Sequence, residues 1–269
     1  MNLEHICNQV VELSKSTGQF IREQRNHFTI DRIETKGLHD FVSYVDKESE
    51  TRLVEGLKQI LPEAGYIAEE GTGSQKPGGL NWVIDPLDGT TNFIHGLPPY
   101  AISIALMDAD KVILGVIYEV TLNECFYAWG NGKAYLNGHE IKVSSISRVN
   151  DSLIATGFPY YDYDRIEPFF QTMEYFIRYS HGMRRLGSAA TDLAYVACGR
   201  FEAFYEYSLQ PWDVAAGAFI VEQAGGKVCD FSGKKNHIFG KEIIASNSNV
   251  FKPFFDIISK FMSNPNQQN

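Results

Sequence analysis

Six stretches of the chain carry the spacing or composition of helices. In the first, which runs to about residue 24, Leu3, Ile6, Val10 and Leu13 recur every three to four positions, as expected of a helix with one apolar face. The other helices are predicted at residues 46–60, 166–179, 189–198, 214–224 and 251–261.

Short runs rich in β-branched and aromatic residues predict strands between these helices. Residues 100–143 contain several such runs separated by turn signals, which predicts an antiparallel meander. Further strands are predicted at residues 28–35, 66–68, 82–84, 152–156 and 201–205, at Val228, and at 243–244. The glycine-rich residues 71–79 are predicted to form a flexible loop. The pattern therefore predicts a mixed α/β protein with layered sheets and helices.

No internal repeat or clear linker divides the 269 residues, so we expect a single domain. The pattern changes near residue 150, which suggests a seam between sub-domains of about residues 1–150 and 151–262. The polar residues 263–269 are predicted to be a disordered tail.

The net charge of −9 argues against nucleic acid as the main partner, because nucleic-acid-binding domains usually carry a basic surface. The four cysteines form no Cys-x-x-Cys pair, so neither a zinc site nor a disulfide framework is predicted. The N-terminus lacks the pattern of a signal peptide, and the longest apolar run, residues 101–107, is too short to cross a bilayer. We therefore expect a soluble cytoplasmic protein without a membrane partner.

The segment that carries the most chemical information is residues 82–93. A buried strand leads into Asp85, and Asp88-Gly89 is expected to make a tight turn on which both carboxylates lie. The backbone N–H groups after Gly89, together with the hydroxyls of Thr90 and Thr91, would form a phosphate cradle at a helix start. Mg²⁺ prefers carboxylate, water and phosphate oxygens, so this segment predicts a magnesium and phosphate site.

Two further acidic positions follow or precede regular elements. Glu69-Glu70 follows a short strand, and Asp213 lies at the start of an apolar helix, where it could simply cap the helix. Their recurrence at element ends favours one shared site. A phosphatase that forms an aspartyl phosphate is disfavoured, because Asp85 and Asp88 are one residue too far apart for an Asp-x-Asp-Gly-Thr motif.

Two long segments, WVIDPLDGTTNFIHG (82–96) and WDVAAGAFIVEQAGG (212–226), resemble the signature motifs of the inositol monophosphatase family. The resemblance extends over most of the chain, because TKGLHDFVSYVD (35–46), AEEG (68–71), RRLGSAATDLAYVACGRFEAFYE (184–206) and the final SN (246–247) fall in the family's order and spacing. It implies a five-layer αβαβα sandwich, a homodimer, and a Mg²⁺-dependent phosphatase that lithium inhibits.

The resemblance also implies a role for each matching residue. Two magnesium ions, with a weaker third, would be held by Glu69, Asp85, the Leu87 carbonyl, Asp88 and Asp213. The catalytic group would be Glu69, Thr90, its hydrogen-bond partner Asp46, and Asp213. Substrate would be bound by Asp88, Gly89, Thr90, Thr91, Gly187, Ser188, Ala189, Glu206 and Asp213, with Lys36 and Glu70 as further candidates. Arg184 and Arg185 could contact substrate, a dimer partner or a surface carboxylate.

The function implied is hydrolysis of inositol 1-phosphate or a similar small polyol phosphate by a metal-activated water. Fructose-1,6-bisphosphatase, histidinol-phosphatase and other phosphatases of the family stay open as alternatives. So does a different class, a non-catalytic regulatory binding protein. Ala68, Gly71 and Ser188 depart from the residues common in the family, and none of them removes a metal ligand.

Overall fold

The computed structural model describes residues 1–28, 33–37, 40–130, 132–160 and 162–262, and the side chains of residues 33–37 and 40–42 fall outside that description. The predicted tail, residues 263–269, lies outside the described residues. Residues 29–32, which are half of the strand predicted at 28–35, also lie outside the described residues.

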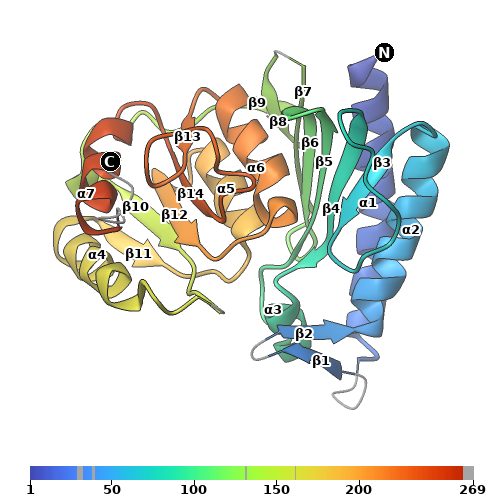
Figure 1. The fold of residues 1–269 in the computed structure, drawn as a ribbon, viewed down its shortest axis with the longest axis horizontal. Coiled ribbons are helices and arrows are strands. Elements are labelled where there is room, and N and C mark those ends of the chain that lie inside the picture. Colours follow the sequence, from blue (N-terminus) through green and yellow to red (C-terminus); the bar gives the residue numbers. More distant parts are fainter. Residues whose placement is uncertain (29–32, 38–39, 131, 161, 263–269) are drawn as a thin grey trace.

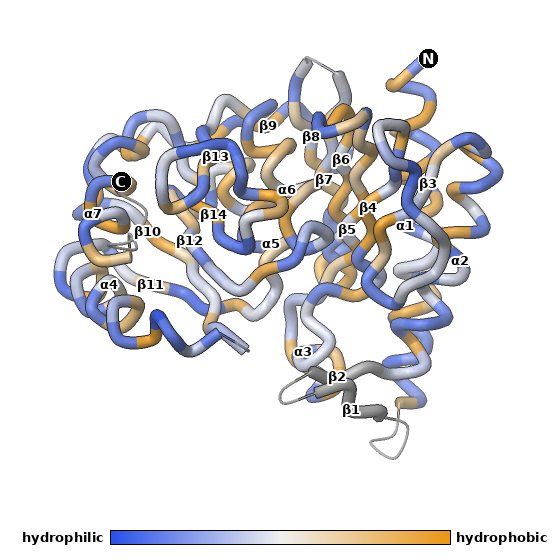
Figure 2. The backbone as a smooth tube through the Cα atoms, in the orientation of Figure 1, coloured by the Kyte–Doolittle hydropathy of each residue, from blue (hydrophilic) through white to orange (hydrophobic). Residues whose placement is uncertain are grey.

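The larger sheet has seven strands in chain order, of which β3 and β4 are parallel and the others antiparallel. Its strands are β3 (Gly65–Ala68), β4 (Leu80–Asp88), β5 (Ala101–Asp108), β6 (Lys111–Glu119), β7 (Glu124–Trp129), β8 (Ala134–Leu136) and β9 (His139–Ile141). The meander predicted at residues 100–143 is confirmed by β5 to β9. Helices α1 (Leu3–Arg25) and α2 (Tyr44–Ile60) cover one face of this sheet, and hydrophobic segments run along its central strands (Figure 2).

The smaller sheet has five strands in the order β11-β10-β12-β14-β13. These are β10 (Leu153–Thr156), β11 (Gly182–Arg184), β12 (Ala203–Tyr207), β13 (Lys227–Cys229) and β14 (Glu242–Ser246). Helices α4 (Ile166–Tyr179) and α7 (Phe251–Met262) pack on its outer face through an aromatic core that includes Phe176, Tyr205 and Phe254.

Helices α5 (Ala189–Ala197) and α6 (Pro211–Gln223) fill the layer between the two sheets (Figure 1). Both are apolar around most of their circumference, as helices buried on two sides must be. Gly115 lets α6 approach β6, because a Cβ atom there would lie 2.9 Å from the Ala216 carbonyl oxygen. The order of layers is αβαβα, which confirms the predicted fold class.

Some predicted boundaries were wrong. Strand β4 does not end at Ile84; it continues to Asp88 with a bulge, since Asp85 pairs with Ser103 and Asp88 with Ala101. The two aspartates therefore lie on a bulged strand end, and the turn begins at Gly89. The sequence pattern did not reveal β11 or β2 (Asp40–Ser43). Strand β1 (Ile33–Gly37) overlaps the end of the strand predicted at 28–35, and it pairs with β2 in a hairpin near the short helix α3 (Thr90–His95) (Figure 1).

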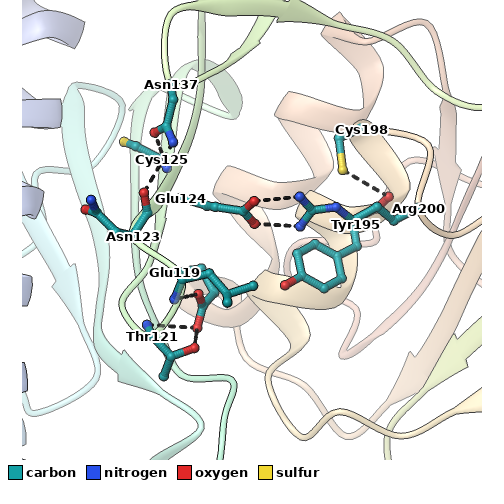
Figure 3. A network of polar contacts seen from close by, with 10 residues as sticks. Glu119, Thr121, Asn123, Glu124, Cys125, Asn137, Tyr195, Cys198 and Arg200 are labelled. Atoms are coloured by element: carbon teal, nitrogen blue, oxygen red, sulfur yellow. Dashed lines mark hydrogen bonds and ion pairs between the residues drawn. The ribbon is translucent and has the colours of Figure 1, made fainter.

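A polar network joins the large sheet to the helical layer (Figure 3). Glu124 at the start of β7 forms two hydrogen bonds of 2.5 Å each with Arg200, which follows α5. The Arg200 guanidinium also lies 4.6 Å from the centre of the Tyr195 ring. This contact fixes α5, and with it one wall of the cavity described below, against the large sheet. In the described part of the chain, no helix combines the length and apolar character needed to cross a bilayer.

Candidate active site

Parallel pairing of β3 and β4 brings Glu69 and Asp85 together. Ala68 is in register with Ile84, and the Glu69 N–H donates a 3.2 Å hydrogen bond to the Ile84 carbonyl. Glu69 follows Ala68 and Asp85 follows Ile84, so the two carboxylates lie at the same edge of the sheet. Asp85 is 2 % exposed, and its carboxylate accepts a 2.9 Å hydrogen bond from the Leu87 N–H.

Gly89 allows the sharp change of direction between β4 and α3. Its φ of +93° lies in the left-handed region, which a residue with a Cβ atom adopts only with strain. A Cβ atom there would also lie 3.0 Å from the Pro99 carbonyl oxygen and 3.2 Å from that of Gly187. Gly89 therefore places the start of α3 beside a loop from the second half of the chain.

Thr90 and Asp46 form a hydrogen bond although 44 residues separate them. The Thr90 hydroxyl lies 2.9 Å from Asp46 Oδ1 and 3.0 Å from the Leu87 carbonyl oxygen. The other Asp46 oxygen accepts hydrogen bonds from the N–H (2.9 Å) and hydroxyl (2.6 Å) of Ser43. Burial raises the pKa of Asp46, and the bonds from Ser43 and Thr90 oppose that rise. The Asp46 carboxylate thus orients the Thr90 hydroxyl.

Asp88 connects the large sheet to α5. Its Oδ2 accepts hydrogen bonds from the Ser188 hydroxyl (2.6 Å) and the Ala190 N–H (2.7 Å). Burial raises the pKa of Asp88 to about 6, although these hydrogen bonds oppose the rise. The carboxylate therefore lies at the positive end of α5, which stabilises its charge.

Asp213 reaches the same cavity from the first turn of α6. It accepts a 2.7 Å hydrogen bond from the N–H of Gln210, which is the N-cap residue of α6, so Asp213 helps to cap the helix from its third position and is not itself the N-cap. Burial and the charge of Asp88 raise the pKa of Asp213 to about 7, and a hydrogen bond with the Asp85 side chain opposes that rise. Burial, followed by the charges of Glu69, Asp88 and Asp213, raises the pKa of Asp85.

These mutually repelling carboxylates are a hard-oxygen donor set that suits Mg²⁺. Among the described residues, no group of three or more His, Cys, Asp or Glu side chains is already arranged around a common metal position. Mg²⁺ does not need such a group, because it usually keeps several waters and takes one or two carboxylates together with substrate phosphate. The acidic side chains therefore fit magnesium, with Glu69, Asp85, Asp88 and Asp213 as the residues that would hold it.

The predicted residues surround one cavity of about 310 Å³, which is large enough for a small ligand. Its walls are Glu69, Asp85, Leu87, Asp88, Gly89, Thr90, Thr91, Gly157, Tyr160, Arg185, Gly187, Ser188, Ala189, Glu206, Ser208, Leu209, Gln210, Trp212 and Asp213. Asp46 lies behind this wall. Glu70 does not line the cavity, and the side chain of Lys36 lies outside the described part of the structure.

Glu50 was missed by the sequence interpretation. It lies on α2, is 0 % exposed, and its two carboxylate oxygens accept 2.8 Å hydrogen bonds from the N–H groups of Glu70 and Thr72. Glu50 therefore fixes the backbone directly after Glu69. In the sequence, Glu50 lies between polar residues, from Lys47 to Arg52, and so looks like part of an exposed helix face. Only the packing of α2 against the loop after Glu69 reveals its role.

Gly157 was also missed, and it provides the space for Glu206. The two residues lie at the ends of the parallel strands β10 and β12, and a Cβ atom on Gly157 would lie 2.0 Å from both Cδ and Oε1 of Glu206. Glu206 is 6 % exposed and lines the cavity, so a side chain at residue 157 would push its carboxylate toward the cavity.

We expect Gly157→Ala to change substrate preference without changing the metal requirement, because the displaced Glu206 carboxylate would occupy part of the cavity that the sequence prediction assigns to substrate. The ratio of kcat/KM between two polyol phosphates should change by roughly tenfold or more, the effect of about one misplaced polar contact. The Mg²⁺ concentration for half-maximal rate should stay near that of the parent. An unchanged ratio would show that Glu206 does not contact substrate.

Comparison with known proteins gives consistent results. Residues 2–260 match the sequence model of the inositol monophosphatase family. The chain is 38% identical over 250 residues to the protein named Nus factor SuhB of Escherichia coli, covering 92% of this chain and 93% of that protein. It is 38% identical over 232 residues to the fructose-1,6-bisphosphatase/inositol-1-monophosphatase of Thermotoga maritima, covering 86% and 88% of the two chains. The crystal structure of the extragenic suppressor protein suhB from Bartonella henselae superposes with a TM-score of 0.89 at 34% identity, covering 94% of this chain and 98% of that one.

Proposed function

Because this chain belongs to the inositol monophosphatase family, we propose that it is a Mg²⁺-dependent phosphatase that hydrolyses a small polyol phosphate such as inositol 1-phosphate. The observation that carries this proposal is the meeting of four acidic side chains in one cavity beside the Thr90–Asp46 hydrogen bond. Such an arrangement suits phosphate-ester hydrolysis, in which negative charge on attacking and leaving oxygens must be stabilised.

The residues of the chain would position the reactants. Thr90, whose proton is directed toward Asp46, can accept a hydrogen bond from the attacking water, and Glu69 would hold the same water. The N–H groups of residues 89–91 would bind the phosphate oxygens, and Asp213 would orient a second water that protonates the leaving oxygen. Bound magnesium would lower the pKa of the attacking water and offset charge on the ester oxygen.

The direct test is phosphate release from inositol 1-phosphate and fructose 1,6-bisphosphate, measured with Mg²⁺, with EDTA and with added lithium. We expect release that requires Mg²⁺, is inhibited by lithium and favours inositol 1-phosphate. Release that favours the bisphosphate would keep the chemistry and change the substrate. Absence of release from these substrates and from a wider panel of phosphate esters, with the protein folded and metal bound, would contradict the proposal.

A regulatory role is the second candidate, because relatives 38% identical over more than nine tenths of this chain are named Nus factor SuhB. It is compatible with catalysis, and the Asp88→Asn variant separates the two. A partner captured equally by parent and variant would support a binding role independent of turnover. Capture that depends on an intact Asp88 would argue for a role of the catalytic cavity itself.

A further inference from the structure

Asn92 connects the two halves of the cavity wall. It lies on α3, and only 8 % of its surface is exposed. Its amide nitrogen donates hydrogen bonds of 2.8 Å each to the carbonyl oxygens of Pro99 and Leu186. Leu186 is 94 positions further along the chain, in the segment that leads from β11 into α5. Both N–H donors of the amide are therefore used, one for each half of the chain.

The segment that Asn92 anchors is not held by backbone hydrogen bonds. Among the described residues, Leu186 and Gly187 form no hydrogen bond with other backbone groups. Gly187 has a φ of +86°, which glycine adopts without strain, but glycine also has the most conformational freedom to lose. A segment without backbone partners needs side chains to pair with its polar groups. For the Leu186 carbonyl, Asn92 provides this pairing.

Gly187 lies between Asn92 and Arg185. A Cβ atom on Gly187 would lie 3.2 Å from Asn92 Nδ2 and 2.7 Å from Arg185 Nη1. The Arg185 guanidinium, in turn, donates a hydrogen bond to the Tyr160 hydroxyl. The Gly187 carbonyl oxygen also lies close to the start of α3, because a Cβ atom on Gly89 would be 3.2 Å from it. The backbone of this segment is therefore packed directly against α3.

The residues after the anchored carbonyl complete the cavity. Ser188 donates its 2.6 Å hydrogen bond to Asp88, and residues 187–189 line the cavity, whereas Asn92 does not. The bond from Asn92 to Leu186 therefore joins two parts of the proposed site. One is the start of α3, proposed to bind phosphate, and the other is the wall at residues 187–189, which the family resemblance assigns to substrate.

We propose that Asn92 is a positioning residue for phosphate-ester hydrolysis, which holds the wall at residues 187–189 at the correct distance from α3. This inference rests on the proposed function and adds a residue that contacts neither metal nor substrate. A misplacement of about 1 Å in a reactive geometry can lower a rate about 10²-fold. Loss of the Asn92 bonds should move the wall and leave the start of α3 in place, because Thr90 remains bonded to Asp46. The substrate alcohol would then be misplaced, whereas the phosphate would not.

Asn81 is a matched control for Asn92. It is 3 % exposed, and its amide nitrogen also donates to two carbonyl oxygens, those of Lys76 (2.8 Å) and Gly79 (3.0 Å). None of these three residues lines the cavity. Asn92→Ala and Asn81→Ala each leave two carbonyls without their donor, so both should lower Tm by several degrees.

Only Asn92→Ala should impair turnover. We expect kcat/KM for inositol 1-phosphate, or for whichever ester the parent uses best, to fall about 10- to 100-fold in Asn92→Ala and by less than about threefold in Asn81→Ala. The inhibition constant of inorganic phosphate should stay within about threefold of the parent in both variants, because the phosphate contacts on α3 are kept. Asn92→Ser keeps one donor on a shorter side chain and should give a smaller loss of turnover. It replaces Asn92→Ala if that variant does not fold.

Equal losses of turnover in the two alanine variants, or a loss of phosphate inhibition that matches the loss of turnover, would overturn the proposal. If the parent releases phosphate from no ester, the proposed function fails, and hydrogen exchange tests the positioning role separately. Mass spectrometry should then show amide exchange in residues 186–190 at least about tenfold faster than in the parent for Asn92→Ala only. Unchanged exchange in this segment would refute the role of Asn92.

Discussion

Replacing Asp88 with asparagine is expected to lower kcat/KM by roughly 10³-fold or more while the protein stays folded, because removing a group that stabilises reacting charge has effects of this size. The variant loses the charge that would hold magnesium. Its amide oxygen can still accept the hydrogen bonds from Ser188 and the Ala190 N–H that connect β4 to α5. Phosphate release at saturating Mg²⁺ gives the activity, and thermal unfolding reports the fold.

The same variant should be at least as stable as the parent when metal is absent. The folded-state pKa of Asp88 is raised to about 6 by burial, so its contribution to stability is present at low pH and is lost as pH rises through that value. Asparagine carries no charge, so the variant does not lose this stability as the pH rises. In EDTA at pH 7.5 the Tm of Asp88→Asn should therefore equal or exceed that of the parent. A marked fall in Tm would mean that the lost activity reflects misfolding.

Asp192→Asn is the matched control for this experiment. Asp192 is a buried aspartate on α5 that does not line the cavity, and burial raises its pKa well above the ordinary value. Asparagine keeps the size and polarity of the aspartate side chain, so we expect activity within about threefold of the parent, a difference of less than 1 kcal/mol. If Asp192→Asn were as inactive as Asp88→Asn, the loss could not be assigned to a metal ligand.

The second large effect is expected at Glu50. Glu50→Gln keeps the size of the side chain, but its amide can accept through only one oxygen and places an NH₂ group against the other N–H. The loop after Glu69 should then lose its fixed position. We expect the Mg²⁺ concentration for half-maximal rate to rise about 10- to 100-fold, as for other residues that orient metal ligands, with kcat largely recovered at high Mg²⁺.

Glu48→Gln, on the same helix, is the control for Glu50→Gln. Glu48 is exposed and forms a 2.9 Å ion pair with Arg52 of the same helix. Surface pairs of this kind contribute at most about 1 kcal/mol to stability, so neither Tm nor the Mg²⁺ requirement should change much. Magnesium binding measured by calorimetry separates positioning from stability. If Glu50→Gln lowers only Tm and leaves Mg²⁺ affinity unchanged, Glu50 has a purely structural role.

The sequence by itself determined most of the regular elements and the chemistry of one segment. The periodicity of α1, α2, α4 and α7 reflects helices with one buried face, and the residues predicted for α4 match the structure. Glu69 and Asp85 could be identified because each follows an apolar run predicted to be a strand, and Asp213 because it precedes an apolar helix. The residue types around Asp85 and Gly89 are also restricted by turn geometry. The family resemblance then supplied roles that spacing alone left open.

The tertiary structure decided how distant residues complete the cavity. Asp88 and Ser188 are 100 positions apart, and their contact depends on the packing of α5 between the sheets. The bulge that carries Asp88, the support of the Glu69 loop by Glu50, and the placement of Arg185 against Tyr160 have no local sequence signal. These features result from long-range packing. A polar group that is buried by this packing can form hydrogen bonds only with the residues that other helices and strands place beside it.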